Sequence, residues 1–138
     1  VLINLLDKKD QKKALTNIVD SLKSGGILIS IEAFSSNLSY LNLCRKELGL
    51  SKIPPAHHNL YLEDLFFETP LLNKESSEEG DNYLSTHYFI TRVLHDVALK
   101  ATDSPFVRNS LFVDFFDKAL RPGIGNFSPL KCMVFRKN

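Results

Sequence analysis

Polar side chains that could do chemistry gather at two places in the sequence. A carboxylate, Glu32, directly follows the apolar run 27–31, and two imidazoles and an amide stand together at His57, His58 and Asn59. Histidine titrates near neutral pH, so His57 or His58 could take a proton from a hydroxyl group. Two prolines precede these residues, which excludes a helix and favours an extended loop. Because polar loops on a rigid scaffold commonly contact ligands, we expect a binding role here.

Asn42 and Arg45 are a second pair of candidates, three residues apart on one side of a predicted helix. A guanidinium could bind a carboxylate or a phosphate. Structural roles compete with these: Asn42 and Arg45 could pin the neighbouring loop, and Glu32 could cap the next helix or pair with Arg45. His58 and Asn59 could likewise only fix their loop through hydrogen bonds to the backbone.

The stretch 22–32 must position Glu32, and the rest of the chain is organised around it. An amphipathic helix ends there, Gly25 supplies the left-handed residue that terminates a helix, and Gly26 lets the chain reverse closely. The run 27–31 is too continuous for a half-exposed strand and predicts one covered on both faces. These features indicate an open α/β sheet, in which ligands bind beyond the carboxyl ends of parallel strands.

The remaining pattern predicts alternating helices and strands in a single domain spanning 1–138. Asp7 or Asp10 caps the first helix, one of Ser35, Ser36 and Asn37 caps the second, and Asn109 or Ser110 caps the last. We predict a helix that Gly49 ends, a short helix over 61–67, a strand over 69–72, a mobile acidic loop over 74–82, a helix from 86 or 87 to about 100, a last helix with an inward apolar stripe up to 120, and a strand over 130–136.

Composition excludes several classes of protein. The 138 residues are 43% hydrophobic and 24% charged, with a net charge of +1, so neither a nucleic-acid partner nor an anionic membrane surface is indicated. No apolar run is long enough to span a membrane. Cys44 and Cys132 lie far apart in apolar patterns and have no second ligand at metal-binding spacing, so we expect free thiols in the cytoplasm and no metal.

Several segments, taken in order, resemble class I S-adenosylmethionine-dependent methyltransferases of one bacterial branch. The stretch 22–32 looks like that family's "LKPGG strand" segment, with Ser24 where proline is usual. The resemblance continues in the segments 2–7 with Gln11, 41–45 with Gly49 and Leu50, 58–62, 88–93, 127–131 and 135–137. It implies the C-terminal part of a Rossmann-like sheet, namely its fifth to seventh strands with the last one antiparallel, together with covering and lid helices.

The resemblance also implies roles for particular residues. Asn4 would lie near the methionine end of S-adenosylmethionine, and Glu32 would face the methyl acceptor, a small molecule. His58, or else His57, would be the base, while Asn42, Arg45 and Asn59 would contact the acceptor. Tyr88 and Arg92, four apart on one helix, would contact it too, although packing and a surface charge are the competing roles for these two.

The glycine-rich cofactor turn of that family has no counterpart in this sequence. We therefore expect an incomplete domain, cut from something longer, that does not bind S-adenosylmethionine usefully alone. Its fifth strand would have an unpaired edge, open to a homodimer or to other chain. The alternative is a non-catalytic α/β interaction module or a methyltransferase-like subunit that requires a partner. An α/β hydrolase or reductase is disfavoured, because no Gly-x-Ser-x-Gly elbow and no Tyr-x-x-x-Lys pair on a helix occur.

Overall fold

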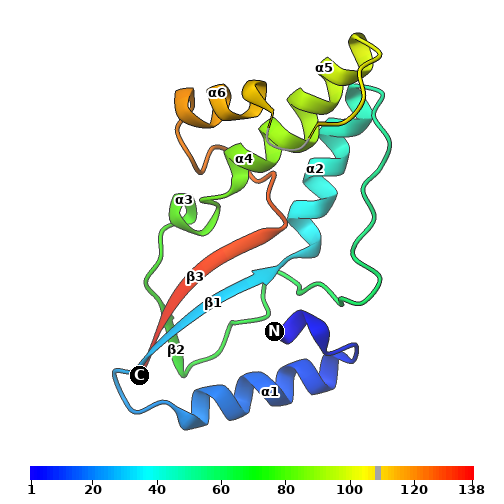
Figure 1. The fold of residues 1–138 in the computed structure, drawn as a ribbon. Coiled ribbons are helices and arrows are strands. Elements are labelled where there is room, and N and C mark those ends of the chain that lie inside the picture. The colour runs from blue at the N-terminus through cyan, green and yellow to red at the C-terminus, as the bar shows by residue number, and fades with distance from the viewer. Residues whose placement is uncertain (108–109) are drawn as a thin grey trace.

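A small antiparallel sheet and surrounding helices make up the fold (Figure 1). The structure is a computed structural model and describes residues 1–107 and 110–138. The first half of the chain contains η1 (Leu2–Asn4), α1 (Lys8–Ser21), β1 (Ile27–Ala33) and α2 (Ser35–Glu47). The second half contains β2 (Leu72–Lys74), α3 (Glu78–Asp81), α4 (Ser85–Phe89), η2 (Ile90–Leu94), α5 (His95–Ala101), α6 (Leu111–Ala119) and β3 (Leu130–Lys137).

The strand order is β1-β3-β2, and β3 runs antiparallel to both of its neighbours. The register pairs Ile27 with Arg136 and Ala33 with Leu130, while Leu72 of β2 pairs with Lys137. β1 and β2 therefore run parallel to each other, and β1 forms an edge of the sheet. The chain is thus a mixed α/β fold, as predicted, with an antiparallel last strand.

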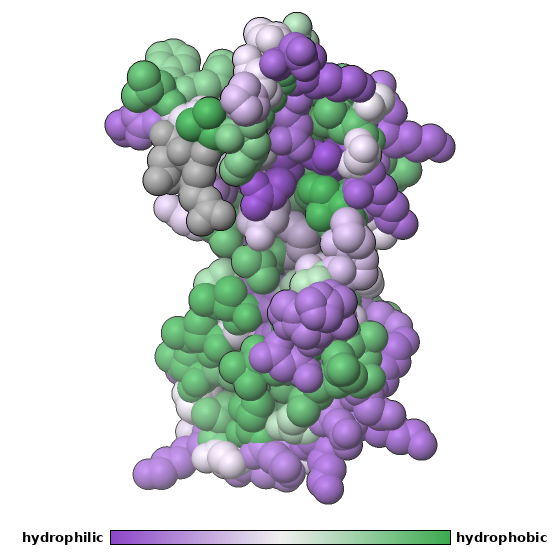
Figure 2. Space-filling model, turned by 45° about the vertical axis from the view of Figure 1, so that its right-hand side comes forward, coloured by the Kyte–Doolittle hydropathy of each residue, from purple (hydrophilic) through white to green (hydrophobic). Residues whose placement is uncertain are grey.

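The elements divide between two ends of an elongated molecule. Figure 1 shows α1 along the sheet at the end that holds both termini, and α2, α4, α5 and α6 at the other end. The space-filling view narrows between these two ends (Figure 2). The buried core at the sheet end contains Leu15 and Val19 of α1 and Met133 and Phe135 of β3. It also contains residues of η1, the 62–67 segment and β2: Leu2, Leu62, Phe66, Phe67 and Leu72. Phe34, directly after β1, completes it.

The turn between α1 and β1 is built as predicted. Gly25 has a φ of +76°, and a Cβ on Gly26 would stand 2.8 Å from the Lys23 carbonyl oxygen. The Gly25 N–H donates to the Lys137 carbonyl at 2.9 Å, and the Lys137 N–H donates to the Gly26 carbonyl at 2.9 Å. The two glycines therefore both reverse the chain and close the end of the sheet.

Helix capping follows the prediction at two of three sites. The Asp7 carboxylate accepts from the Lys9 N–H at 2.6 Å, and the Ser110 hydroxyl accepts from the Val113 N–H at 3.2 Å. Asn109, the other candidate for the last cap, lies outside the described residues. α2 is different: its N-cap is Phe34 and no side chain caps it, so the predicted capping by Ser35, Ser36 or Asn37 was wrong.

The segment 61–74 departs from the prediction. A short helix over 61–67 was wrong, because this segment forms turns after Leu62 makes a parallel bridge to Phe34. The Leu62 N–H donates to the Ala33 carbonyl at 2.8 Å, and Phe66 and Phe67 are buried in the core. These long-range contacts override the local helical preference. The following strand is β2, at 72–74 rather than 69–72.

The acidic segment 74–82 contains a short helix, α3, rather than loop alone. The Ser77 hydroxyl caps it by accepting from the Gly80 N–H at 3.1 Å. Asp81 is buried and pairs with Lys74, which gives one of the four acidic residues a structural role.

The helix predicted from 86 or 87 to about 100 is confirmed as the continuous run α4-η2-α5, over 85–101. One turn of it, η2, is a wider π-helix. The predicted inward stripe of the last helix was wrong, because no residue of α6 is buried and Leu111 is 87% exposed.

The face of β1 that carries Ile27, Ile29 and Ile31 is also exposed, by 50% to 65% at these three residues. The prediction that this strand is covered on both faces was therefore wrong for the described chain. The opposite face is covered, since Ser30 and Glu32 are buried there and Leu28 packs against the core. The end of the molecule that holds β1 and α1 consequently displays a broad apolar surface (Figure 2).

Candidate functional site

A pocket of about 230 Å³ lies at the carboxyl end of β1. It is formed by the end of β1, the start of β3, one side of α2, the loop after α2 and the helix α4-η2. Most of its lining is apolar: Ile3, Ala33, Leu38, Leu41, Ile53, Pro129 and Leu130. The polar lining consists of Asn59, Tyr61, Tyr88 and Arg92. Three of the predicted acceptor-binding residues, Asn59, Tyr88 and Arg92, are thus brought together, from a loop and a helix far apart in sequence.

Tyr88 and Arg92 lie on one face of the helix where it enters the π turn. The Arg92 guanidinium lies over the Tyr88 ring, 5.8 Å from its centre. A π turn has more residues than an α turn, which keeps residues four apart nearly in line. Burial raises the pKa of the Tyr88 hydroxyl, while nearby Arg92 lowers it and Tyr61 raises it further. Tyr88 therefore stays protonated at neutral pH and can donate a hydrogen bond.

Asn59 contributes a half-buried amide to the same pocket. Within the described residues, its Oδ1 is buried and has no hydrogen-bond partner. A buried polar atom without a partner is costly, at roughly 1–3 kcal/mol. The backbone around it is held, because the Asn59 N–H donates to the Ala56 carbonyl at 2.9 Å and the Leu60 N–H to the Ile3 carbonyl at 2.7 Å.

Asn42 does not line the pocket but holds one of its walls. Its Nδ2 donates to the Ile53 carbonyl at 2.9 Å, and its Oδ1 accepts from the Ile53 N–H at 2.8 Å. Both ends of the amide are therefore engaged by one residue of the loop. Asn42 thus has the structural role considered from the sequence, which is to pin the neighbouring loop. These two hydrogen bonds hold Ile53 at the wall of the pocket.

Arg45 also holds the structure around the pocket rather than the pocket itself. It is 6% exposed, its Nε donates to the Ser51 carbonyl at 2.8 Å, and its Nη1 pairs with the Asp96 carboxylate at 2.6 Å. The same Nη1 also donates to the Arg92 carbonyl. Arg45 thus ties α2 to the following loop and to the π turn that carries Arg92, and the carboxylate it binds belongs to the chain.

Glu32 is buried and faces the backbone of η1. Its carboxylate accepts from the N–H groups of Leu2 at 2.8 Å and Ile3 at 3.2 Å, and from the main-chain nitrogen of Val1 at 2.7 Å. Glu32 therefore caps the turn before α1. It neither caps the following helix nor pairs with Arg45, which were the two structural roles considered from the sequence. Its neighbour Ala33 lines the pocket, so Glu32 lies beside the pocket without lining it.

The remaining candidates, Asn4, His57 and His58, are exposed. The two imidazole rings contact each other edge to face, with centres 5.0 Å apart, in the turn before Asn59. Neither lines the pocket, which contains only Asn59 of the 57–59 segment. Asn4 borders a different groove, of about 690 Å³, that follows the free side of β1 and α1.

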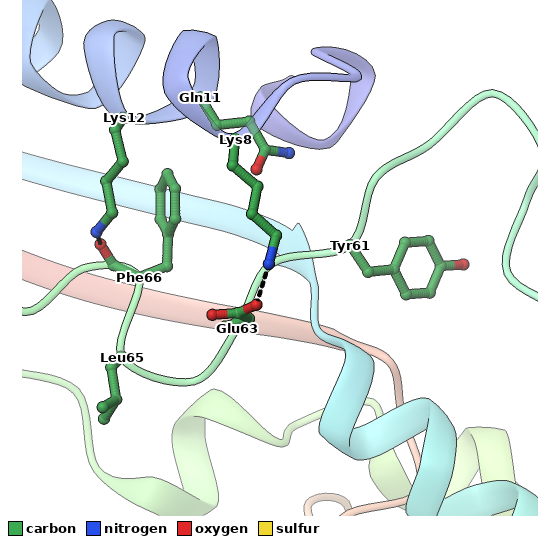
Figure 3. A pocket seen from close by; sticks show the side chains of 7 residues that line it. All are labelled: Lys8, Gln11, Lys12, Tyr61, Glu63, Leu65 and Phe66. Atoms are coloured by element: carbon green, nitrogen blue, oxygen red, sulfur yellow. Dashed lines mark hydrogen bonds and ion pairs between the residues drawn. The ribbon is translucent and has the colours of Figure 1, made fainter.

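Sequence reasoning missed Tyr61 as a pocket residue, although its position two residues after Asn59 in an extended loop was a usable signal. Tyr61 also borders a second pocket, of about 200 Å³, between α1 and the 63–66 turn (Figure 3). There Lys8 pairs with Glu63, and Lys12 donates to the Phe66 carbonyl at 2.7 Å. Figure 3 shows the Tyr61 ring turned away from the Lys8–Glu63 pair. Because both lysine side chains already have partners within the chain, they are less available to a ligand than the polar groups of the first pocket.

Comparisons with known proteins add no identification. No family model, no curated protein and no solved structure matches the chain. Over the residues that the structure describes, no helix is long and apolar enough to cross a membrane. Over the same residues, no group of three or more His, Cys, Asp and Glu side chains could hold a metal ion.

Proposed function

We propose that this chain is the acceptor-binding part of a class I S-adenosylmethionine-dependent methyltransferase that acts on a small molecule. The observation that carries the proposal is the pocket at the carboxyl end of β1, which collects Asn59, Tyr88 and Arg92. Open α/β sheets bind their ligands in this position. Support also comes from the strand directions, since the resemblance implies an antiparallel last strand and β3 is antiparallel to both neighbours.

In this proposal the described residues bind and orient the acceptor. S-adenosylmethionine carries an activated methyl group, so alignment of the acceptor is the main task of the protein. Tyr88 and Arg92 would hold polar groups of the acceptor, and the apolar wall formed by α2 and Ile53 would exclude water. Asn42 and Arg45 act indirectly, by holding Ile53 and the turn of Arg92. His58, or else His57, is retained as the candidate base on the exposed turn beside the pocket.

In this proposal, few of the described residues lie at the cofactor. Asn4 is the only one expected at the cofactor, and its side chain is exposed. We therefore propose that residues outside this chain supply most of the contacts to S-adenosylmethionine.

A partner-requiring, non-catalytic subunit is the second candidate, and one observation favours it. Ile27, Ile29 and Ile31 expose a continuous apolar strip on β1, which is typical of a surface that another segment covers. This candidate shares the fold but needs no methyl transfer.

The test is transfer of label from S-[methyl-³H]adenosylmethionine to low-molecular-weight acceptors by the full-length gene product. We expect labelled small molecules, and a loss of at least about tenfold in kcat/KM for Arg92→Gln, because a hydrogen bond from a charged group contributes at least that factor. Arg121→Gln, an exposed arginine outside the pocket, is the matched control. Absence of labelled product with every acceptor fraction would favour the non-catalytic subunit.

A further inference from the structure

Among the described residues, the one charged group on the lining of the pocket at the end of β1 is positive. Of the residues that line it, Arg92 alone is ionised at neutral pH, and the others are apolar, amide or phenolic. Within the described residues Arg92 makes no ion pair, and Asp96, four residues further along the helix, pairs with Arg45 at 2.6 Å. Because Arg92 is itself exposed, its positive charge stands at the open side of the pocket.

Two of the other three polar groups of the lining are phenolic hydroxyls that can donate, and the third is the Asn59 amide, whose Oδ1 has no partner among the described residues and can accept. The Tyr88 hydroxyl remains protonated because burial raises its pKa, and Tyr61 brings a second phenolic hydroxyl to the same pocket. A guanidinium flanked by hydroxyl donors suits an oxygen-rich anion, since a guanidinium presents several N–H groups in a planar fork.

The rest of the lining limits the size and polarity of the ligand. Leu38, Leu41, Ile53 and Leu130 provide apolar walls, and the volume of about 230 Å³ is below the ~300–1,000 Å³ typical of sites for drug-sized ligands. The pocket suits a compact apolar body rather than a sugar chain or a peptide.

From these observations we propose that the pocket binds a small organic anion, whose carboxylate or phosphate is held by Arg92 and whose apolar body lies against α2 and Ile53. The inference rests on the proposed function, because it names the chemical class of the methyl acceptor. Asn59 supplies the one amide of the lining, and its Oδ1, unpartnered in the described part of the chain, can accept a hydrogen bond from a hydroxyl or amino group on the ligand.

Four ring compounds of similar size separate charge from shape: benzoate, phenyl phosphate, benzyl alcohol and benzylamine. Each is titrated into the ¹⁵N-labelled chain while the backbone amide resonances of Asn59, Tyr88 and Arg92 are followed. We expect saturable shifts with benzoate or phenyl phosphate, at least about tenfold weaker binding of benzyl alcohol, and no binding of benzylamine. Comparing the two anions shows whether the site prefers a carboxylate or a phosphate.

Arg92→Gln should weaken anion binding at least about tenfold and leave benzyl alcohol unchanged, whereas Arg92→Lys should retain part of the affinity. The control Arg121→Gln should change neither, and amide spectra of each variant verify folding. Affinity for both anions no greater than that for benzyl alcohol, or unchanged anion binding in a folded Arg92→Gln, would overturn the inference. Anion binding here without S-adenosylmethionine binding by the full-length product would instead overturn the proposed function and leave the anion site standing.

Discussion

Replacing Arg45 with leucine tests whether α2, the loop after it and the π turn are held together at one point. Arg45 lies between three segments, and its guanidinium makes contacts to the Ser51 carbonyl, the Arg92 carbonyl and the Asp96 carboxylate. Leucine keeps the apolar stem but removes every one of these contacts. Two carbonyl oxygens and one carboxylate then lose their shared partner.

The expected loss of stability is about 3 kcal/mol. Breaking a buried ion pair by removing one partner costs about 3–5 kcal/mol. Because the Asp96 side chain is 28% exposed, water can recover part of its lost interaction, which favours the lower end of that range. For a chain of 138 residues, this corresponds to a decrease in Tm of roughly 10 °C.

Urea unfolding followed by far-UV circular dichroism measures this change, with Lys46→Gln as the control because Lys46 is exposed on the same turn. Asp96→Asn and the double variant complete a mutant cycle, for which we expect a coupling energy of about 1–2 kcal/mol. A loss below about 1 kcal/mol for Arg45→Leu, or no coupling with Asp96, would refute the assignment of Arg45 as the residue that holds this junction.

Three further predictions concern other parts of the chain. Gly26→Ala should lower the free energy of unfolding in urea by about 1–3 kcal/mol, because the new Cβ would stand 2.8 Å from the Lys23 carbonyl oxygen. Gly25→Ala has open space around its Cβ and should cost only about 1 kcal/mol, for its φ of +76°. A larger loss for Gly25→Ala than for Gly26→Ala would contradict the described geometry of this turn. Burial raises the pKa of Tyr88, so above about pH 10 the unfolded chain loses this proton while the folded chain still keeps it. The contribution of Tyr88 to the free energy of unfolding is therefore fully present below about pH 10 and should fall as the pH rises above that value. Tyr88→Phe should reduce that alkaline loss in thermal unfolding, with the exposed Tyr83→Phe as control, and an unchanged pH profile would argue against a buried hydroxyl. Ile29→Lys should change the free energy of unfolding by no more than about 0.5 kcal/mol, since Ile29 is 65% exposed. If β1 pairs with another copy of the chain, the same substitution should reduce self-association in sedimentation velocity. Self-association equal to that of the unchanged chain would exclude the exposed face of β1 as a contact between copies.

Local chemistry made the α1–β1 turn and two of the three helix caps predictable. Gly25 and Gly26 stand where a helix must end and a strand must begin, and Asp7 and Ser110 supply side-chain acceptors at helix N-termini. The antiparallel β3 followed from the family resemblance rather than from its residues. In these cases the decisive interactions join residues close in sequence or repeat a known pattern.

The wrong predictions concern features that depend on the rest of the fold and not on local sequence. The pattern over 61–67 favoured a helix, but Leu62 pairs with Phe34 and draws Phe66 and Phe67 into the core. The apolar stripe of α6 and the continuous apolar run of β1 both predicted burial, but such patterns show only that a surface is apolar and not whether anything covers it. The faces of Leu111 and Ile29 are exposed within the described residues.

The sequence predicted three of the four polar residues that line the pocket, missed Tyr61, and named six further candidates that do not line it. Asn59, Tyr88 and Arg92 share one pocket, while Asn42 and Arg45 support it from behind. Sequence spacing placed Asn42 and Arg45 on one side of a helix correctly. It could not show that their hydrogen-bonding groups would be taken by Ile53, Ser51 and Asp96, since these partners depend on how the loop and α5 pack against α2.

Calorimetric titration with S-adenosylmethionine tests the central claim most directly, with the full-length gene product and the 138-residue chain measured side by side. We expect micromolar binding by the full-length product and no saturable binding by the chain alone, because Asn4 is the one residue of the chain that the proposal places at the cofactor. Absence of binding by the full-length product would contradict the methyltransferase proposal. Micromolar binding by the isolated chain would contradict the division into a cofactor-binding part and an acceptor-binding part.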